Sequence, residues 1–183
     1  MTMMSGTTLH DHVSSGSLLG HVAQHSKMRI LVVDDEPANV ALLEDMLAEA
    51  GYTRVQSITD SRKAFETCNA FSPDLILLDL MMPHVDGFTI LDTLRSTPAE
   101  LFLPIIVLTA DVNEQTKRRA LKAGATDFLL KPFDHLEVLL RIGNLLEMRR
   151  LHRQLDTQRA AYEEALRNRS LELRDAHAQN GTA

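Results

Sequence analysis

The segment from Leu75 to Gly87, LILLDLMMPHVDG, places the strongest constraint on the fold of this chain. Four apolar residues in a row, bounded by turn-forming residues, are too few for a helix and predict a strand that is buried on both faces. Strands of that kind occur in parallel sheets, and this one ends at a single carboxylate, Asp79. Ligands bind at the carboxyl ends of strands in open α/β sheets, so Asp79 is a candidate functional residue. The alternative is that Asp79 only caps the turn that contains Pro83.

Short apolar runs and segments of helical period alternate along the chain. The predicted strands are RILVV from Arg29, residues 54–58, LILLD ending at Asp79, PIIVLT from Pro104, and residues 127–130. The predicted helices cover residues 37–50, 61–70, 87–95 and 113–123, and another starts near Asp134. This alternation predicts a doubly wound α/β fold, with helices on both faces of one five-stranded parallel sheet.

Composition narrows the class of protein. A hydrophobic content of 44% is enough for a packed core, and a net charge of −6 argues against nucleic acid as the main partner. The one cysteine, Cys68, excludes an intramolecular disulfide, and we expect it to pack inward from a helix together with Ala64 and Phe65. No apolar stretch reaches the ~18 residues of a membrane span, and no signal peptide pattern is present. We therefore expect a soluble, cytoplasmic protein that has no membrane partner.

The first 27 residues are rich in Ser, Thr, Gly and His and show no sustained period. Residues 1–27 are therefore predicted to form a flexible leader. Four histidines lie in it, and we expect their side chains to be solvated rather than to bind a metal: His10, His12, His21 and His25.

Four of the five predicted strands end in polar groups, which are Asp34 with Asp35, then Asp79, Thr109 and Lys131. Because parallel strands share a direction, these groups should meet at one edge of the sheet. Three carboxylates repel one another there, and a hard divalent cation, best Mg²⁺, would hold them together. A lysine and a hydroxyl beside such carboxylates point to phosphoryl transfer with Asp79 as the nucleophile. Singly, the lysine could be a solvated charge and the Thr-Ala step a turn.

Four motifs together give the chain a family resemblance. VVDDEP, LLDLMMPHVDG, LTA and LLKPF follow the first, third, fourth and fifth strands, at intervals of 44, 30 and 22 residues between Asp35, Asp79, Thr109 and Lys131. In these motifs the chain resembles the receiver domain of bacterial two-component response regulators over about residues 28–147. The resemblance implies a flavodoxin-like sheet in the order 2-1-3-4-5, to which this chain adds a long C-terminal helix.

The resemblance also implies a role for each motif residue. Asp79 would accept a phosphoryl group from a sensor histidine kinase or a histidine phosphotransfer protein. Thr109 and Lys131 would contact the phosphoryl oxygens, and the Lys131-Pro132 bond would be cis. Phe128 holds the position of the family's switch aromatic residue, where many relatives have Tyr. Since Phe has no hydroxyl to bond outside, we expect its ring to prefer the interior in either state.

Magnesium is the implied cofactor. Asp35, Asp79 and the backbone carbonyl of Met81 would ligate Mg²⁺, while Asp34 would act mostly through water. Met81 and Asp111 occupy positions that line the path of hydrolytic water in the family, so we expect them to influence the lifetime of the phosphoryl group.

A polar, helix-forming sequence runs from about Asp134 to about Ala178 and is interrupted only by Gly143. Seven of ten positions on one heptad seam are apolar: Leu145, Met148, Leu155, Tyr162, Leu166, Leu173 and Ala176. The three polar positions are His152, Arg159 and Arg169. Residues 148–183 are thus predicted to be a helical, partly coiled-coil extension that holds a homodimer, the alternative being a single solvated helix. We expect Arg149, Arg150 and Arg153 at its base to be available for partners.

These observations favour a response regulator whose only chemistry is its own phosphorylation and autodephosphorylation. No helix-turn-helix pattern follows the receiver, so no DNA-binding output domain is expected in this chain. An alternative is the N-terminal regulatory receiver of a larger enzyme, such as a cyclic-di-GMP phosphodiesterase or cyclase. A phosphatase of the haloacid dehalogenase type is excluded, because it needs an aspartate two residues after the nucleophile, where this chain has Met81.

Overall fold

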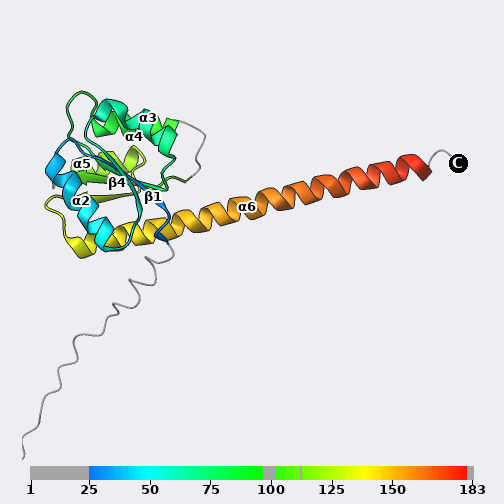
Figure 1. Ribbon diagram of the computed structural model, residues 1–183. Helices are drawn as coiled ribbons and strands as arrows, with labels where there is room; N and C mark the ends of the chain where they lie inside the picture. Colours follow the sequence, from blue (N-terminus) through cyan, green and yellow to red (C-terminus); the bar gives the residue numbers. More distant parts are fainter. Residues whose placement is uncertain (1–24, 97–101, 112, 181–183) are drawn as a thin grey trace, which may run out of the picture.

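A computed structural model describes residues 25–96, 102–111 and 113–180, with residues 172–180 as backbone only (Figure 1). Five parallel strands form one sheet in the order β2-β1-β3-β4-β5. The strands are β1 (Arg29–Val33), β2 (Arg54–Ile58), β3 (Leu75–Asp79), β4 (Ile105–Thr109) and β5 (Asp127–Leu130). The helices are α2 (Pro37–Glu49), the 3-10 helix η1 (Ser61–Lys63), α3 (Ala64–Phe71), α4 (Gly87–Ser96), α5 (Glu114–Lys122) and α6 (His135–Asn180). The predicted doubly wound, flavodoxin-like fold with a long C-terminal helix is confirmed.

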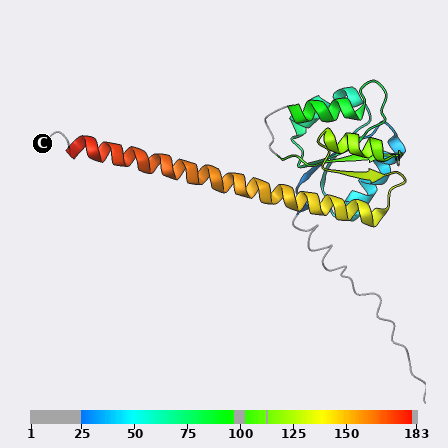
Figure 2. The same ribbon diagram turned by 180° about the vertical axis from the view of Figure 1, so that it is seen from behind.

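The sheet lies between two helical layers, which Figures 1 and 2 show from opposite sides. Side chains alternate between the two faces of a strand, so Ile30 and Val32 of β1 point to one layer while Leu31 and Val33 point to the other. The first face packs against α2 and the start of α6, and the second packs against α3, α4 and α5. Because β1, β3 and β4 are covered on both sides, they are apolar along almost their whole length.

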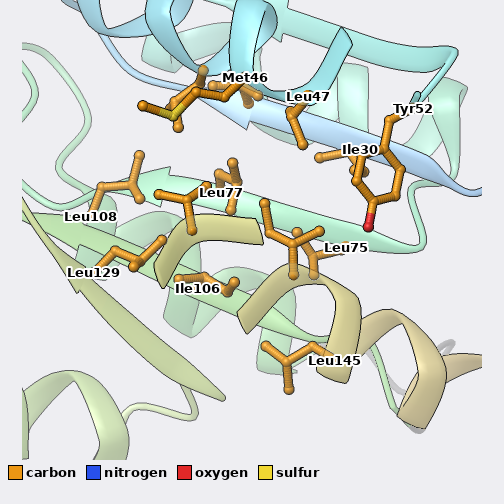
Figure 3. Packing of buried hydrophobic residues seen from close by; sticks show 14 of the residues in the cluster. Ile30, Met46, Leu47, Tyr52, Leu75, Leu77, Ile106, Leu108, Leu129 and Leu145 are labelled. Carbon is orange, nitrogen blue, oxygen red and sulfur yellow. The ribbon is translucent and has the colours of Figure 1, made fainter. Parts of the chain in front are cut away.

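The layer below α2 shows how the two halves of the chain are joined (Figure 3). Leu47 of α2 and Leu145 of α6 belong to the same buried cluster as Leu75, Leu77 and the other strand residues between them. Val138, Ile142 and Leu146 of α6 have no exposed surface. The first third of α6 is therefore a structural layer of the α/β domain, and only the remainder extends from it.

Two local predictions are wrong. Phe65 faces outward, with 41% of its surface exposed, while Ala64 and Cys68 are buried as expected. The reason is that Ala64 and Cys68 are four residues apart and share one face of α3, whereas Phe65 is rotated by about 100° from Ala64. His25 is buried rather than solvated, because its Nε2 atom lies 2.9 Å from Oε2 of Glu147. The predicted long C-terminal helix is confirmed, and α6 continues through Gly143 without a break. The other three leader histidines and residues 1–24 lie outside the described residues.

The base of the α6 extension is fixed to the amino ends of the strands. The His152 ring stacks on Phe102, with 4.2 Å between ring centroids and 14° between planes. Nη1 of Arg153 donates to Oδ1 of Asp74 at 2.6 Å, and Nη1 of Arg149 donates to the carbonyl oxygen of Phe102. Arg150 pairs with Glu147 on the same helix. The expectation that these arginines are available for partners is wrong for Arg149, which is almost fully buried, whereas Arg150 and Arg153 keep exposed surface beside their acceptors.

Glu147 gives this contact region a pH dependence. The Arg150 guanidinium, followed by His25, lowers the pKa of Glu147 from 4.5 to about 2. A carboxyl whose pKa is lower in the folded state stabilises the fold above its ordinary pKa, and that stabilisation is lost as the pH falls toward the folded-state value. The urea midpoint of Glu147→Gln should therefore lie below that of the wild type at pH 7, and the two should converge between about pH 4.5 and pH 2.

The matched control is Glu163→Gln, which removes an exposed carboxylate that pairs with Arg159 farther along the same helix. Its urea midpoint should stay close to that of the wild type throughout, because exposed ion pairs contribute little. If the difference in urea midpoint between Glu147→Gln and the wild type did not change with pH, the stabilisation by this contact would not come from the lowered pKa of Glu147.

Candidate functional site

The site lies at the carboxyl ends of the strands, where their register brings four chain segments together. Asp79 pairs with Leu108 across β3 and β4, and Thr109 pairs with Leu130 across β4 and β5. Lys131 follows Leu130 directly, and its N–H donates to the carbonyl oxygen of Thr109 at 2.9 Å. The Lys131-Pro132 bond is cis, as expected. The ends of β1, β3, β4 and β5 thus deliver the predicted polar residues to one edge, as the parallel topology requires.

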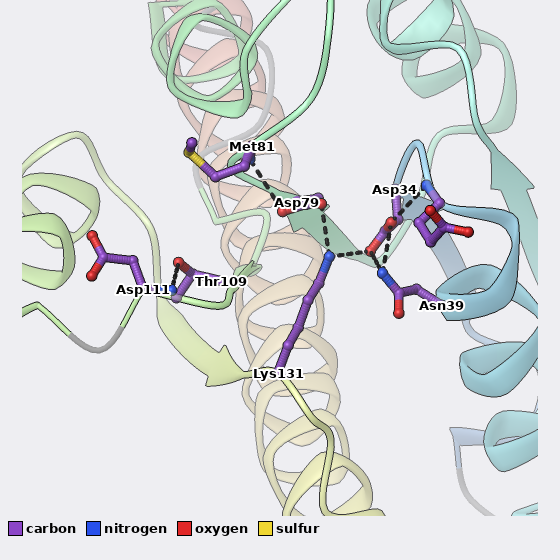
Figure 4. A network of polar contacts seen from close by, with 8 residues as sticks. Asp34, Asn39, Asp79, Met81, Thr109, Asp111 and Lys131 are labelled. Atoms are coloured by element: carbon purple, nitrogen blue, oxygen red, sulfur yellow. Dashed lines mark hydrogen bonds and ion pairs between the residues drawn. The ribbon is translucent and has the colours of Figure 1, made fainter.

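Lys131 joins the first and third strands (Figure 4). Its Nζ atom lies 2.7 Å from Oδ2 of Asp34 and 2.7 Å from Oδ2 of Asp79. Asp34 and Asp79 are almost fully buried, so the lysine supplies the positive charge that two desolvated carboxylates need. Burial by itself would lower the pKa of Lys131, but the hydrogen bonds and charges of Asp34 and Asp79 outweigh it and raise this pKa above its usual range. The ammonium group is therefore held in its charged form.

Asp34 is held by several donors besides Lys131. Its Oδ1 atom accepts from the backbone N–H of Glu36 at 3.0 Å, and Nδ2 of Asn39 lies 3.1 Å from Oδ1 and 3.3 Å from Oδ2. Asn39 was not predicted from the sequence. The signal available in the sequence was a polar amide in the first turn of a helix that comes directly after an acidic pair. The structure places this amide next to a residue of the buried face, Val40.

The three carboxylates form a cluster that could hold a metal ion. One oxygen from each of Asp34, Asp35 and Asp79 lies within 4.8 Å of the other two, and Asp35 is only half-buried. Hard cations such as Mg²⁺ take oxygen ligands of this kind and keep several water molecules. One lysine cannot balance three carboxylates, so the charge of the cluster fits a divalent cation. The N–H of Met81 donates to Oδ1 of Asp79 at 3.1 Å, which fixes the orientation of that carboxylate.

Thr109 begins a second hydrogen-bonded group on the other side of Asp79. The backbone N–H of Asp111 donates to the Thr109 hydroxyl oxygen at 3.0 Å. Oγ1 of Thr116 donates to Oδ2 of Asp111 at 2.6 Å, and the N–H of Asn113 donates to Oδ1 at 2.8 Å. These bonds, with that from Thr116 the strongest, lower the pKa of Asp111. Asp111 is thus held by the first residues of α5 and its cap, and its N–H holds the buried Thr109 hydroxyl on the side of Asp79 (Figure 4).

Phe128 is not enclosed by the fold. Its ring is half-buried, and the Nζ atom of Lys117 on α5 lies 4.6 Å from the ring centroid. The guanidinium of Arg141 on α6 lies 5.7 Å from the same centroid. Both cations can interact favourably with the ring face. The ring also packs against the hydrophobic cluster on this face of the sheet, so it lies between the interior that was expected and the two cations at the surface.

The fold and the site together define a class of protein: a doubly wound α/β domain with an acidic cluster and a lysine at the carboxyl edge of its sheet. Residues 30–143 match the model of a known family, the response regulator receiver domain. The matched residues are more than half of the chain, and the chain belongs to this family.

Known relatives agree with this assignment. The chain is 43% identical over 118 residues to the DNA-binding dual master transcriptional regulator RpaA of Synechocystis, an alignment that covers 64% of this chain and 48% of RpaA. The solved receiver domain of the sensor histidine kinase PA1611 from Pseudomonas aeruginosa PAO1, which has a magnesium ion in its active site cleft, is 31% identical with a TM-score of 0.61. That alignment covers 66% of this chain and 98% of the kinase domain.

A third relative is a solved structure named as a response regulator/GGDEF domain protein. The solved structure of a probable two-component response regulator/GGDEF domain protein is 28% identical, with a TM-score of 0.67, and the match covers 73% of this chain and 55% of that one. The chain spans about half the length of RpaA and of this protein. Within the residues described, no helix has both the length and the apolar content that crossing a bilayer requires.

Proposed function

We propose that this protein is a two-component response regulator that accepts a phosphoryl group on Asp79 from a sensor histidine kinase or a histidine phosphotransfer protein. The observation that carries the proposal is the position of Lys131, whose Nζ atom bridges Asp34 and Asp79 at 2.7 Å. A cation already bound to the attacking carboxylate is placed to neutralise the oxygens of an incoming phosphoryl group.

The acidic cluster would hold Mg²⁺ through Asp35, Asp79 and the backbone carbonyl of Met81, with Asp34 acting through water. Asp34 fits an indirect role, because its two oxygens already accept from Lys131, Asn39 and the N–H of Glu36. When bound, the cation supplies positive charge that offsets the repulsion between the carboxylates and the phosphoryl oxygens.

In the proposed step, an oxygen of Asp79 forms a bond to phosphorus while the P–N bond of the phosphohistidine breaks, and the imidazole leaves with the bonding electron pair. The product is an acyl phosphate on Asp79. Lys131 and Thr109 each contact a phosphoryl oxygen. Met81, whose side chain is 72% exposed, and Asp111 flank the route by which water would later hydrolyse the adduct.

The chain would consist of three parts. Residues 28–147 form the receiver, residues 148–183 form a helical extension, and residues 1–27 form the leader. Phosphorylation would act through Thr109 and Phe128 to shift the equilibrium of a homodimer held partly by the extension, without nucleic acid as a partner. The likeness to a response regulator/GGDEF domain protein favours a second candidate function, in which this chain is the regulatory receiver of a larger enzyme that makes or degrades cyclic-di-GMP.

The test is to incubate the protein with acetyl phosphate and Mg²⁺, and to measure its intact mass. We expect the mass of one phosphoryl group to be added, and fragmentation of the adduct after borohydride reduction should assign it to Asp79. Chelation of the metal with EDTA should suppress the adduct. A modification that forms equally without Mg²⁺, or one assigned to another carboxylate, would contradict the proposal. Light scattering before and after modification gives the accompanying change in oligomeric state.

A further inference from the structure

The predicted heptad seam on α6 conflicts with contacts that the receiver already makes. Leu145, its first position, is buried in the cluster between α6 and the sheet. His152, its third position, stacks on Phe102. Arg159, its fifth position, pairs with Glu163 at 3.1 Å on the same helix. Leu145 and His152, two of the first three seam positions, are therefore committed to contacts with the receiver, and a second helix cannot use them as core contacts, while the fifth position holds a charged side chain rather than an apolar one.

A different repeat describes the apolar side chains that α6 leaves exposed. Leu140, Leu151 and Tyr162 follow one another at intervals of eleven residues, and Leu155 and Leu166 are separated by the same interval. These five side chains are between 43% and 67% exposed. Leu173 continues the first series in the sequence. Eleven residues make three turns at 3.67 residues per turn, close to the 3.6 of a straight α-helix, so these residues lie in one nearly straight line.

We propose that this line, named here the eleven-residue stripe and made of Leu140, Leu151, Leu155, Tyr162 and Leu166, is the surface on which a second copy of the chain docks. The two α6 helices would lie parallel and in register, with each stripe facing the other. The proposal rests on the proposed function for its dimer, and it names the contact surface. It replaces the left-handed heptad coil by a straight or slightly right-handed pair.

A second copy fits this stripe for reasons of size. From Leu140 to Leu171 the helix makes roughly nine turns. With two or three contact residues per turn, a pair of such helices reaches about 20–30 residues a side, the number found in stable interfaces. All side chains from Leu151 to Leu171 are exposed in the single chain. A helix of this length and polarity persists in water only when its apolar face is covered.

The groups beside the stripe favour the parallel orientation. On one flank lie Gln158 and Ala165, with Arg169 eleven residues after Gln158, and on the other lie the paired charges of Arg159 and Glu163. In a parallel two-fold pair, the first flank of one helix faces the second flank of its partner, so Gln158 can hydrogen-bond to the charged groups and Arg169 lies on the side of the partner's Glu163. An antiparallel pair would instead place the two charged flanks against each other.

The test is disulfide cross-linking of single-cysteine variants in the full chain, with Cys68 replaced by Ser. Leu151→Cys and Tyr162→Cys lie on the stripe, while His152→Cys and Arg159→Cys lie only on the heptad seam. Under mild oxidation, we expect covalent dimer at both stripe positions and severalfold less at both seam positions. Strong cross-linking at 152 and 159 would overturn the proposal in favour of the heptad. Cross-linking at only one of 151 and 162 would overturn the parallel arrangement, and none at any position would overturn the dimer.

A second measurement does not depend on oxidation. Leu166→Asp should abolish the dimer in analytical ultracentrifugation, whereas Leu171→Asp, which changes an equally exposed leucine away from the stripe, should leave it intact. An equal effect of the two variants would contradict the stripe. Both experiments should be repeated in an Asp79→Asn background. A cross-linking pattern that is kept there shows that the helix contact stands even if phosphoryl acceptance at Asp79 fails.

Discussion

Asp79→Asn is expected to abolish phosphoryl acceptance from acetyl phosphate in the presence of Mg²⁺. The carboxamide oxygen has no negative charge with which to attack phosphorus, and it removes one of the three carboxylates within 4.8 Å of one another. Lys131 would keep its contact with Asp34 at 2.7 Å, so the change removes the nucleophile without removing the cation beside it. The mass of the protein after incubation should equal that of the untreated variant.

The control is Asp111→Asn, which changes another carboxylate at the same sheet edge but outside the acidic cluster. That variant should still gain a phosphoryl group, and the rate at which the adduct is hydrolysed should change. The urea midpoint of Asp79→Asn should be at least that of the wild type, because one of three repelling carboxylates is neutralised. An adduct that persists in Asp79→Asn would show that another group is the acceptor.

Gly87→Ala is expected to have the largest effect on stability. A Cβ atom at this position would lie 2.1 Å from the carbonyl oxygen of Asp79 and 2.7 Å from Cα of Leu80, both of which are backbone atoms. The N–H of Gly87 also donates to the carbonyl oxygen of Leu80 at 3.1 Å, so the loop after β3 folds directly back on the strand end. Relieving the clash must move the segment that carries Asp79, and we expect a loss of about 2–4 kcal/mol in the free energy of unfolding.

Gly143→Ala is the matched control, because a Cβ there would have nothing within 4 Å. Alanine has the higher helix propensity, so this variant should gain about 0.5–1 kcal/mol. Urea unfolding measures the stability of both variants. Acetyl phosphate labelling of Gly87→Ala tests whether Asp79 still accepts a phosphoryl group after its segment has moved. Equal midpoints for the two variants would show that the turn after β3 relaxes easily around an added methyl group.

The sequence was sufficient to predict the sheet and most residues of the site, for a physical reason. Buried parallel strands are marked by short apolar runs, and a run that ends at Asp79 or Lys131 fixes where that side chain emerges. The strand direction then places such residues at one edge without any knowledge of distances. Local patterns are enough wherever the fold itself does the positioning.

What the sequence could not predict depends on contacts between distant segments. The stacking of His152 on Phe102, the burial of His25 against Glu147 and the cations over Phe128 each join residues that are far apart in the chain or on different elements. No periodicity records such partners. The heptad prediction for α6 failed at Leu145 for the same reason, since apolar spacing alone does not say which surface covers a side chain.

Helix α6 is both part of the receiver's interior and the whole of the exposed extension, and this continuity has a mechanical consequence. No proline lies between His135 and Asn180, so the helix can behave as a lever whose short arm is clamped in the core. From Ile142 to Leu171 the long arm measures about 43 Å. A tilt of only about 5° at the clamp would carry the distant end sideways by about 4 Å, enough to separate two side chains in contact.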